Sequence, residues 1–177
     1  SWEKQKEIKN VMLFLQDHGV STSFAAKIYK QYGNESVNKV RENPFRLADD
    51  IWGIGFKTAD GIAQKLGFGK EAFVRLRSGI MYTLSNLADQ GHVYATKEQL
   101  IKTAAELLEA EEGCVVMTLD QMLADHDLIL QKVEIPKEQR KHEMPADLEQ
   151  PEWKLAESQI TEAIYLPPFY YAETGVA

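Results

Sequence analysis

The spacing of apolar residues in the first ninety positions is helical almost throughout. Apolar side chains recur three or four residues apart in residues 2–17, 21–33 and 73–89, and each run ends at or just before a glycine. Ser21 stands where it can cap the second of these helices. These runs predict three amphipathic helices.

Shorter elements are predicted between the second and third of these helices. One short helix is expected over residues 35–42, and Asn43-Pro44 is typical of an N-cap followed by proline at the first helical position. The stretch Trp52-Gly53-Ile54-Gly55 then predicts a sharp turn that leads into a helix over residues 56–66.

From about residue 92, β-prone segments alternate with predicted helices. His92–Ala95 and residues 128–133 are β-prone, while Thr96 begins a capping-box sequence for a helix that extends to about Leu108. A further helix is predicted from Leu119 to about Ala124. A small strand, two helices and a second strand indicate a winged-helix-like unit.

The C-terminal residues are less regular. From 136 to 150 the chain is almost devoid of apolar residues, which is typical of a linker or exposed loop. Residues 164–171 are apolar but contain two prolines, and such a segment is expected to need a partner surface. We therefore divide the chain into residues 1–70, residues 71–135, and a polar linker with a proline-containing lead-in over 136–177.

Composition narrows the classes of protein. With 44% hydrophobic residues the chain sustains a core, and it has neither an apolar run of the ~20 residues that span a bilayer nor a signal peptide. Cys114, the single cysteine, excludes disulfides within the chain and is interpreted as a buried structural thiol in a reducing, cytoplasmic setting. Because the sequence begins Ser-Trp-Glu without methionine, we expect it to be an internal fragment.

Charge is distributed unevenly along the chain. The net charge is −7, yet residues 1–80 hold 13 basic and 9 acidic side chains, a net of +4. Residues 81–177 hold 7 basic and 18 acidic side chains, a net of −11. This asymmetry favours a mildly basic working half and an acidic remainder, although an ordinary uneven surface would give the same counts.

Gly53-Ile54-Gly55-Phe56-Lys57-Thr58 resembles a phosphate-binding loop at first sight. A Walker A loop requires two glycines five residues apart with Lys-Ser/Thr directly after the second, preceded by a strand. Here Phe56 separates Gly55 from Lys57, and a predicted helical turn precedes the loop. The sequence therefore predicts no ATP site, no cofactor site and no catalytic residue within these 177 residues.

The same residues fit a helix–hairpin–helix corner. Gly53 and Gly55 permit a tight turn, Ile54 fills the space between the helices, and the N–H groups at the next helix favour a phosphate oxygen. Lys57 adds a cation and Thr58 a hydroxyl, so residues 53–58, Phe56 included, form the candidate phosphate site. Such contacts read no base sequence.

A weaker copy of this motif lies earlier in the chain. Gly19, Val20, Ser21 and Thr22 follow the first helix in the same manner, but Ser21 replaces the second glycine. Paired hairpins grip both strands of a duplex, which favours DNA over a helical corner without a ligand. That ligand-free corner remains the alternative interpretation.

Other residue patterns in the sequence do not indicate a metal site or an enzyme. The four histidines have no metal-ligand spacing, and Glu106–Glu112 is typical of a solvated helix face. A helix–hairpin–helix glycosylase would need a catalytic aspartate and often a four-cysteine cluster, which the sequence lacks. Trp52 suits either stacking on a base or anchoring the hairpin in the core, and we favour the core anchor.

The run from Asn43 to Leu47 and the run from Trp52 to Asp60 closely resemble the N-terminal region of bacterial RecD-like helicases, the long RecD/TraA type. The resemblance continues through Arg75–Ile80, the turn after Gly91, and Ile164–Pro168. It implies tandem helix–hairpin–helix elements before a superfamily 1 motor that unwinds DNA 5′ to 3′ with ATP and Mg²⁺. Ile164–Pro168 would then lead into that motor.

We therefore expect a mainly α fold, with tandem helix–hairpin–helix elements followed by a helical, winged-helix-like region with minor β-structure. The expected function is sequence-independent binding of single-stranded or forked DNA within an ATP-dependent helicase of DNA repair or recombination. The motor domains of the same protein are the other expected partner, and no membrane is involved. The alternative is a protein-interaction scaffold that docks the motor and touches DNA little.

Overall fold

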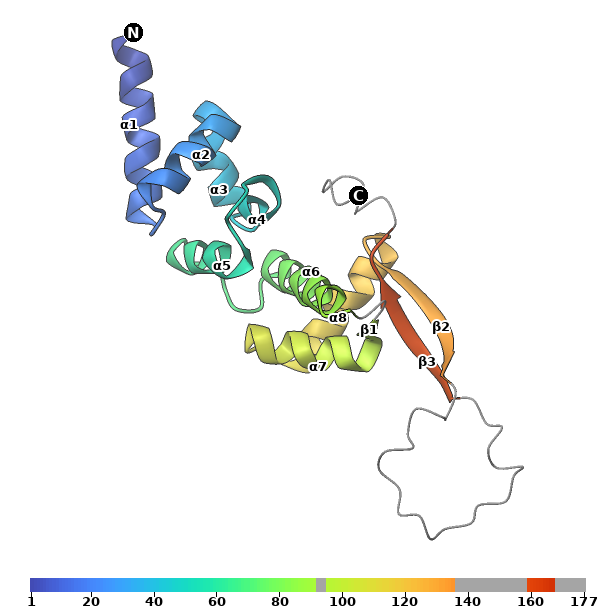
Figure 1. Ribbon diagram of the computed structural model, residues 1–177. Coiled ribbons are helices and arrows are strands. Elements are labelled where there is room, and N and C mark those ends of the chain that lie inside the picture. Colours follow the sequence, from blue (N-terminus) through green and yellow to red (C-terminus); the bar gives the residue numbers. More distant parts are fainter. Residues whose placement is uncertain (92–94, 136–158, 168–177) are drawn as a thin grey trace, which may run out of the picture.

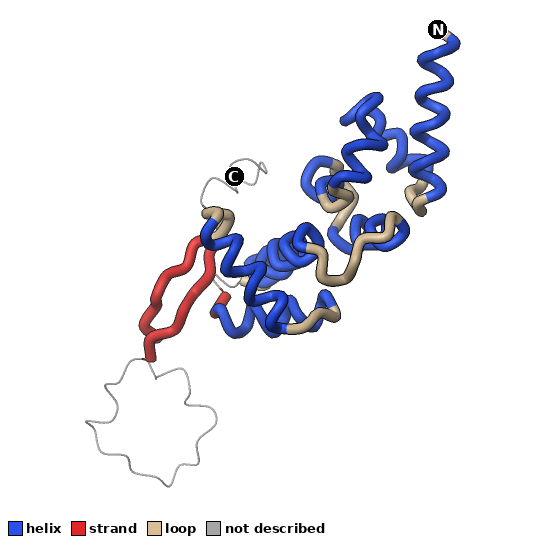
Figure 2. Tube along the Cα trace, turned by 180° about the vertical axis from the view of Figure 1, so that it is seen from behind, coloured by secondary structure: helices blue, strands red, loops and turns tan. Residues whose placement is uncertain are grey.

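The computed structural model describes residues 1–91, 95–135 and 159–167. The first helices and the small antiparallel sheet lie at opposite ends of the described structure, with the later helices between them (Figures 1 and 2). The first half contains α1 (Trp2–Asp17), α2 (Thr22–Tyr32), the 3₁₀ turn η1 (Gly33–Glu35), α3 (Ser36–Glu42), α4 (Arg46–Asp50) and α5 (Phe56–Lys65). The second half contains α6 (Phe73–Asp89), β1 (Ala95–Thr96), α7 (Lys97–Leu108), α8 (Glu112–Ala124), β2 (Ile129–Ile135) and β3 (Gln159–Tyr165).

A glycine with positive φ and a serine cap set the boundary between α1 and α2. Gly19 takes a φ of +80° after α1, a conformation that glycine adopts without a Cβ penalty. Ser21 then caps α2, its Oγ accepting a hydrogen bond from the Phe24 N–H at 3.3 Å. These two residues confirm the predicted boundary between the first two helices.

The short helix before the second hairpin begins later than predicted. Asn43 Oδ1 accepts a hydrogen bond from the Phe45 N–H at 3.1 Å, so the asparagine does cap a turn. That turn contains Pro44, and regular α-helix begins only at Arg46. Side-chain capping two residues on, as in an Asx-turn, accounts for the shift.

The second half has the order of elements of a winged helix. One helix, a short strand, two helices and a two-stranded hairpin follow one another, and the sheet order is β1-β3-β2 with antiparallel pairing throughout. Ile164 of the central strand faces Ala95 on one side and Leu130 on the other. Thr96 caps α7 through a hydrogen bond from the Gln99 N–H at 3.2 Å, as the sequence predicts.

Three predictions in this half are corrected. The third helix begins at Glu112, well before the predicted Leu119, so Glu106–Glu112 spans the end of α7, a corner and the first residue of α8 and does not form one helix face. Residues 159–165, predicted to belong to the linker and lead-in, form the central strand, and Ile164 and Leu166 are buried. Cys114 is only partly buried. Of the strand predicted at His92–Ala95, residues 92–94 lie outside the described residues.

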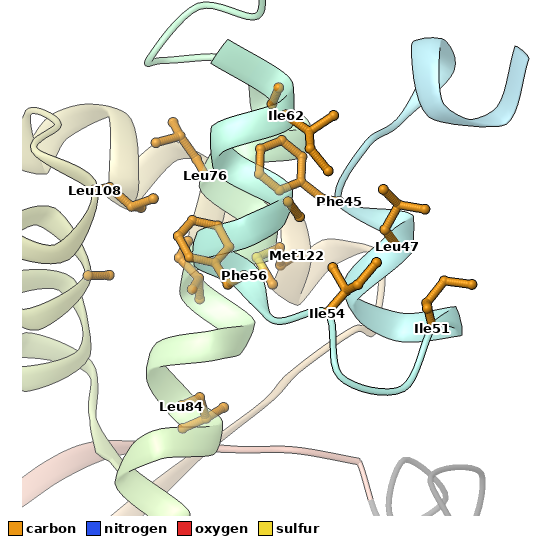
Figure 3. Close-up of a cluster of buried hydrophobic side chains, with 14 of the residues drawn as sticks. Phe45, Leu47, Ile51, Ile54, Phe56, Ile62, Leu76, Leu84, Leu108 and Met122 are labelled. Carbon is orange, nitrogen blue, oxygen red and sulfur yellow. The ribbon is translucent and has the colours of Figure 1, made fainter. Parts of the chain in front are cut away.

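A single apolar cluster runs through both halves (Figure 3). Its members come from all the larger helices, including Leu15 of α1, Ile62 of α5 and Met122 of α8. α6 and α7 approach closely at Gly79, where a Cβ atom would stand only 2.8 Å from Leu108 Cγ. Because the cluster is continuous, the hairpins are fixed relative to the winged-helix unit.

Candidate nucleic-acid interface

The second hairpin turn is the five-residue connection, residues 51–55, between α4 and α5. Gly53 has a φ of +94°, and the Ile54 N–H closes the turn on the Ile51 carbonyl at 3.2 Å. Gly55 is extended, with φ −95° and ψ 179°, and serves as the N-cap of α5. The turn therefore delivers the chain directly into the first turn of the next helix.

The two bulky side chains of the candidate phosphate site face the core. Ile54 is 4% exposed and lies beside α4 with Leu47 and Ile51 (Figure 3). Phe56 is also 4% exposed, and its ring stacks between those of Phe45, at 5.8 Å, and Tyr82, at 5.4 Å. These two residues can therefore offer a ligand only their backbone groups, while their side chains hold the hairpin rigid.

The glycines of the turn serve different purposes. Gly53 is required by its positive φ, and a Cβ there would also stand 3.3 Å from Phe24 Cε1. Gly55 has an ordinary extended backbone, and no atom of the described residues would lie within 4 Å of its Cβ. The fold therefore makes no demand for glycine at 55, whereas a ligand that approaches the backbone closely would.

The N-terminus of α5 is open. Its first-turn N–H groups have no intrahelical acceptor, and within the described part of the chain no side chain caps them. Lys57 and Thr58 are exposed on this same turn. N–H donors, the positive end of the helix dipole and a lysine together make a suitable site for an anion such as phosphate.

The first hairpin is partly occupied by its own side chains. Gly19 and Thr22 are exposed and Val20 is buried, as in the second hairpin. The Ser21 hydroxyl, however, takes up one first-turn N–H group, and the Thr22 hydroxyl accepts a hydrogen bond from Gln16 Nε2 at 3.1 Å. Because serine stands here in place of the motif's second glycine, the first hairpin has fewer N–H donors left for a ligand than the second.

Beside the turn of each hairpin lies a lysine from a helix of the other hairpin. A Cβ at Gly19 would stand 2.6 Å from Nζ of Lys65, at the end of α5. A Cβ at Gly53 would stand 3.9 Å from Nζ of Lys27, in α2. Sequence reasoning missed both lysines, because each is distant along the chain from the hairpin that it serves.

These lysines have no anionic partner among residues 1–91, 95–135 and 159–167. Among the described residues, Arg75 pairs with Asp60 at 2.8 Å and Arg77 with Asp127 at 3.1 Å, while many exposed lysines have no ion pair. No ion pair involving Lys27, Lys57 or Lys65 occurs in that part of the chain. The three ammonium groups near the hairpins are therefore available to an anionic ligand.

Trp52 does not anchor the hairpin, so that prediction is wrong. Its side chain is 89% exposed, and the space under the turn is filled instead by Ile51 and Ile54, which are 5% and 4% exposed. The indole contacts Lys27, whose Nζ lies 5.4 Å from the ring centroid. Periodicity could not show this, because the turn rotates Trp52 outward while its neighbours point inward.

The acidic end of α4 is tied to α2. The Tyr32 hydroxyl donates a hydrogen bond to Asp50 Oδ2 at 2.6 Å. Burial raises the pKa of Tyr32, and the hydrogen bond and charge of Asp50 raise it further. The pKa of Asp49 is also raised, first by desolvation and then by the charge of Asp50. This link helps fix the second hairpin relative to the first.

A buried ion pair fastens α5 to the winged-helix unit. The Arg75 side chain is 6% exposed, and its Nε and Nη2 donate to the Asp60 carboxylate at 2.8 and 3.2 Å. Its Nη1 donates to the carbonyls of Lys70 and Leu108 at 2.8 and 2.9 Å. The helix that carries Lys57 is thus held by α6 and by the end of α7.

Other kinds of site find no support in the described residues. Residues 1–91, 95–135 and 159–167 contain no group of three or more His, Cys, Asp or Glu side chains placed to bind a metal ion. His18 caps α1, its Nδ1 lying 2.7 Å from the Phe14 carbonyl oxygen, and His126 has a φ of +61° beyond α8. None of the helices described is long and apolar enough to cross a membrane.

Two hairpins packed side by side in a helical unit, followed by a winged helix, define a tandem helix–hairpin–helix protein. The family model of the HHH domain of ATP-dependent RecD2 DNA helicases matches residues 4–94, and the chain belongs to this family. It is also 27% identical over 114 residues to the ATP-dependent RecD2 DNA helicase of Deinococcus radiodurans. That alignment covers 64% of this chain but only 16% of the relative.

Proposed function

We propose that this chain is a sequence-independent DNA-binding module that holds the phosphate backbone at its hairpins. The second hairpin is the principal contact. Gly53, Gly55 and the first turn of α5 supply N–H donors, and Lys57 and Thr58 supply side chains. Gly19 and Thr22 of the first hairpin form a weaker second contact.

The open N-terminus of α5 is the observation that carries this proposal. Its N–H groups lack a cap within the described chain, while the corresponding turn of α2 is capped by Ser21 at 3.3 Å. Gly55 leaves room for close approach, and Lys27 and Lys57, which form no ion pair in the described part of the chain, place positive charge beside the site. The likeness to RecD2 helicases supports DNA as the anion.

Salt dependence tests the proposal. If about three phosphates are neutralised by Lys27, Lys57 and Lys65, log K should fall with log salt at a slope of about −2.7 on duplex and about −2.1 on single strands. Raising salt from about 50 to about 200 mM would then weaken duplex binding by about fortyfold. The affinity should be independent of base sequence.

Lys57→Glu supplies the residue-level test. We expect it to weaken binding to every DNA sequence and to reduce the salt slope by about one. Lys102→Glu is the matched control, because Lys102 is an exposed lysine on α7, beyond α6 from the hairpins (Figure 1). Equal affinity in the Lys57 and Lys102 variants would show that the second hairpin is not the contact.

The winged-helix unit suits a different role from DNA binding. Its third helix, α8, contains no lysine or arginine, and it exposes Met117 to 75%. Residues 81–177 as a whole carry a net charge of −11. We therefore assign to this half the role of a docking scaffold. Its partner would be the motor of a helicase that contains this chain, called the parent protein below.

The parent protein would supply the chemistry. It would be a cytoplasmic, ATP-dependent helicase of DNA repair or recombination that moves 5′ to 3′, with ATP and Mg²⁺ bound in its motor. The chain described here would hold DNA for that motor. Deleting residues 1–70 from the parent should then lower its DNA affinity while leaving ATP hydrolysis at saturating DNA largely intact.

A further inference from the structure

Trp52 is the most exposed large hydrophobic side chain of the described residues, at 89%. A tryptophan buries about 150–250 Å² when it is packed, at about 25 cal/mol per Å². Trp52 contributes little of this burial free energy, although the smaller Ile51 and Ile54 near it in sequence are buried. The fold thus provides no reason for an indole at this position.

The indole nevertheless has a contact with the other hairpin. Lys27 reaches across from α2, with its Nζ 5.4 Å from the Trp52 ring centroid and 5.5 Å from that of Phe24. Phe24 in turn stands against Gly53, so the two aromatic rings and the ammonium group flank the hairpin. With a cation over one face of the indole, the other face is open to a flat partner.

The surroundings indicate what that partner is. Trp52 directly precedes Gly53, the first residue of the candidate phosphate site, so an exposed aromatic side chain and an anion site belong to one continuous segment, residues 52–58. A nucleotide combines the same two groups, a phosphate and a base. Inside a duplex each base is already stacked on both sides, and only an unpaired base offers a free face to the indole.

We propose that Trp52, backed by Lys27, is a stacking platform for an unpaired base of single-stranded DNA whose phosphate is held at residues 53–58. This inference rests on the proposed function and adds the form of DNA that the hairpin selects. Stacking contributes to single-strand affinity alone, while the phosphate contacts of Lys57 serve single strands and duplex alike.

The chain contains a matched control for this site. Trp2 is also exposed, at 73%, and also lies near a lysine, with Lys6 Nζ 5.3 Å from its ring centroid. It begins α1, at the end marked N in Figure 1, away from the hairpin turns. Trp2→Ala therefore removes the same kind of exposed indole without touching the proposed platform.

Affinities for a single strand of about 20 nucleotides and a blunt duplex of similar length would be measured by fluorescence anisotropy at low salt. Trp52→Ala should weaken single-strand binding by roughly 5- to 150-fold, with duplex affinity and the salt slope unchanged. Trp52→Phe should retain part of the affinity, and Trp2→Ala should match the wild-type protein. Because the chain has three tryptophans, a Trp2→Phe, Trp153→Phe background isolates Trp52, whose fluorescence should be quenched by the single strand.

The outcomes separate this inference from the proposed function. If Lys57→Glu weakens binding but Trp52→Ala does not, the platform is refuted and the phosphate site stands. An equal loss on single strand and duplex in Trp52→Ala also refutes stacking on an unpaired base. If the wild-type chain binds neither DNA at low salt, both proposals fall.

Discussion

The two glycines of the second hairpin should respond in opposite ways to the same added methyl group. Gly53→Ala forces a side chain into a φ of +94° and places Cβ 3.3 Å from Phe24 Cε1. Such backbone strain costs about 1–3 kcal/mol, and we expect a loss of about 2 kcal/mol in the free energy of unfolding. With a urea m-value near 2 kcal/mol/M, the unfolding midpoint should fall by about 1 M.

Gly55→Ala should leave stability almost unchanged. Its φ of −95° and ψ of 179° suit alanine, and no described atom meets the new Cβ. A gain of about 0.4–1 kcal/mol from the stiffer unfolded chain offsets a similar loss of N-cap preference. The methyl group would instead stand between the open N–H groups and a phosphate, and losing one charge-assisted hydrogen bond should weaken DNA binding at least about tenfold.

Urea unfolding followed by circular dichroism, together with DNA anisotropy, separates the two effects. Gly69→Ala is the control, because Gly69 is likewise exposed with open space at its Cβ but lies beyond α5. Unchanged DNA affinity in Gly55→Ala would refute the argument that a ligand approaches this backbone. A large loss of stability in Gly55→Ala would show that the fold itself needs the glycine.

Two further predictions concern α5, which carries the site. Asp60→Ala leaves the buried Arg75 without its carboxylate partner and should cost about 3–5 kcal/mol in urea unfolding; a loss below about 1 kcal/mol would mean that water replaces the carboxylate. Gly61→Ala adds a methyl group to an exposed position in the helix interior with open space around it, and should raise the free energy of unfolding by about 0.5–1 kcal/mol; a lower thermal midpoint would contradict this.

Local sequence determined the ends of several helices, although α8 begins at Glu112 and not at the predicted Leu119. Ser21 and Thr96 cap the helices that they were predicted to cap, and Gly19 and Gly91 take the positive φ expected after a helix. Capping and glycine conformation depend on groups within a few residues, which a single sequence displays directly. The sharp turn at Gly53 was predicted for the same reason.

Only the tertiary structure decided what surrounds that hairpin. Lys27 and Lys65 reach the hairpins from helices that the sequence places elsewhere, and strand β3 pairs with β2 across residues 136–158. Trp52 faces outward because the turn gives the interior to Ile51 and Ile54. Period and composition describe each segment alone, whereas these contacts depend on how distant segments pack.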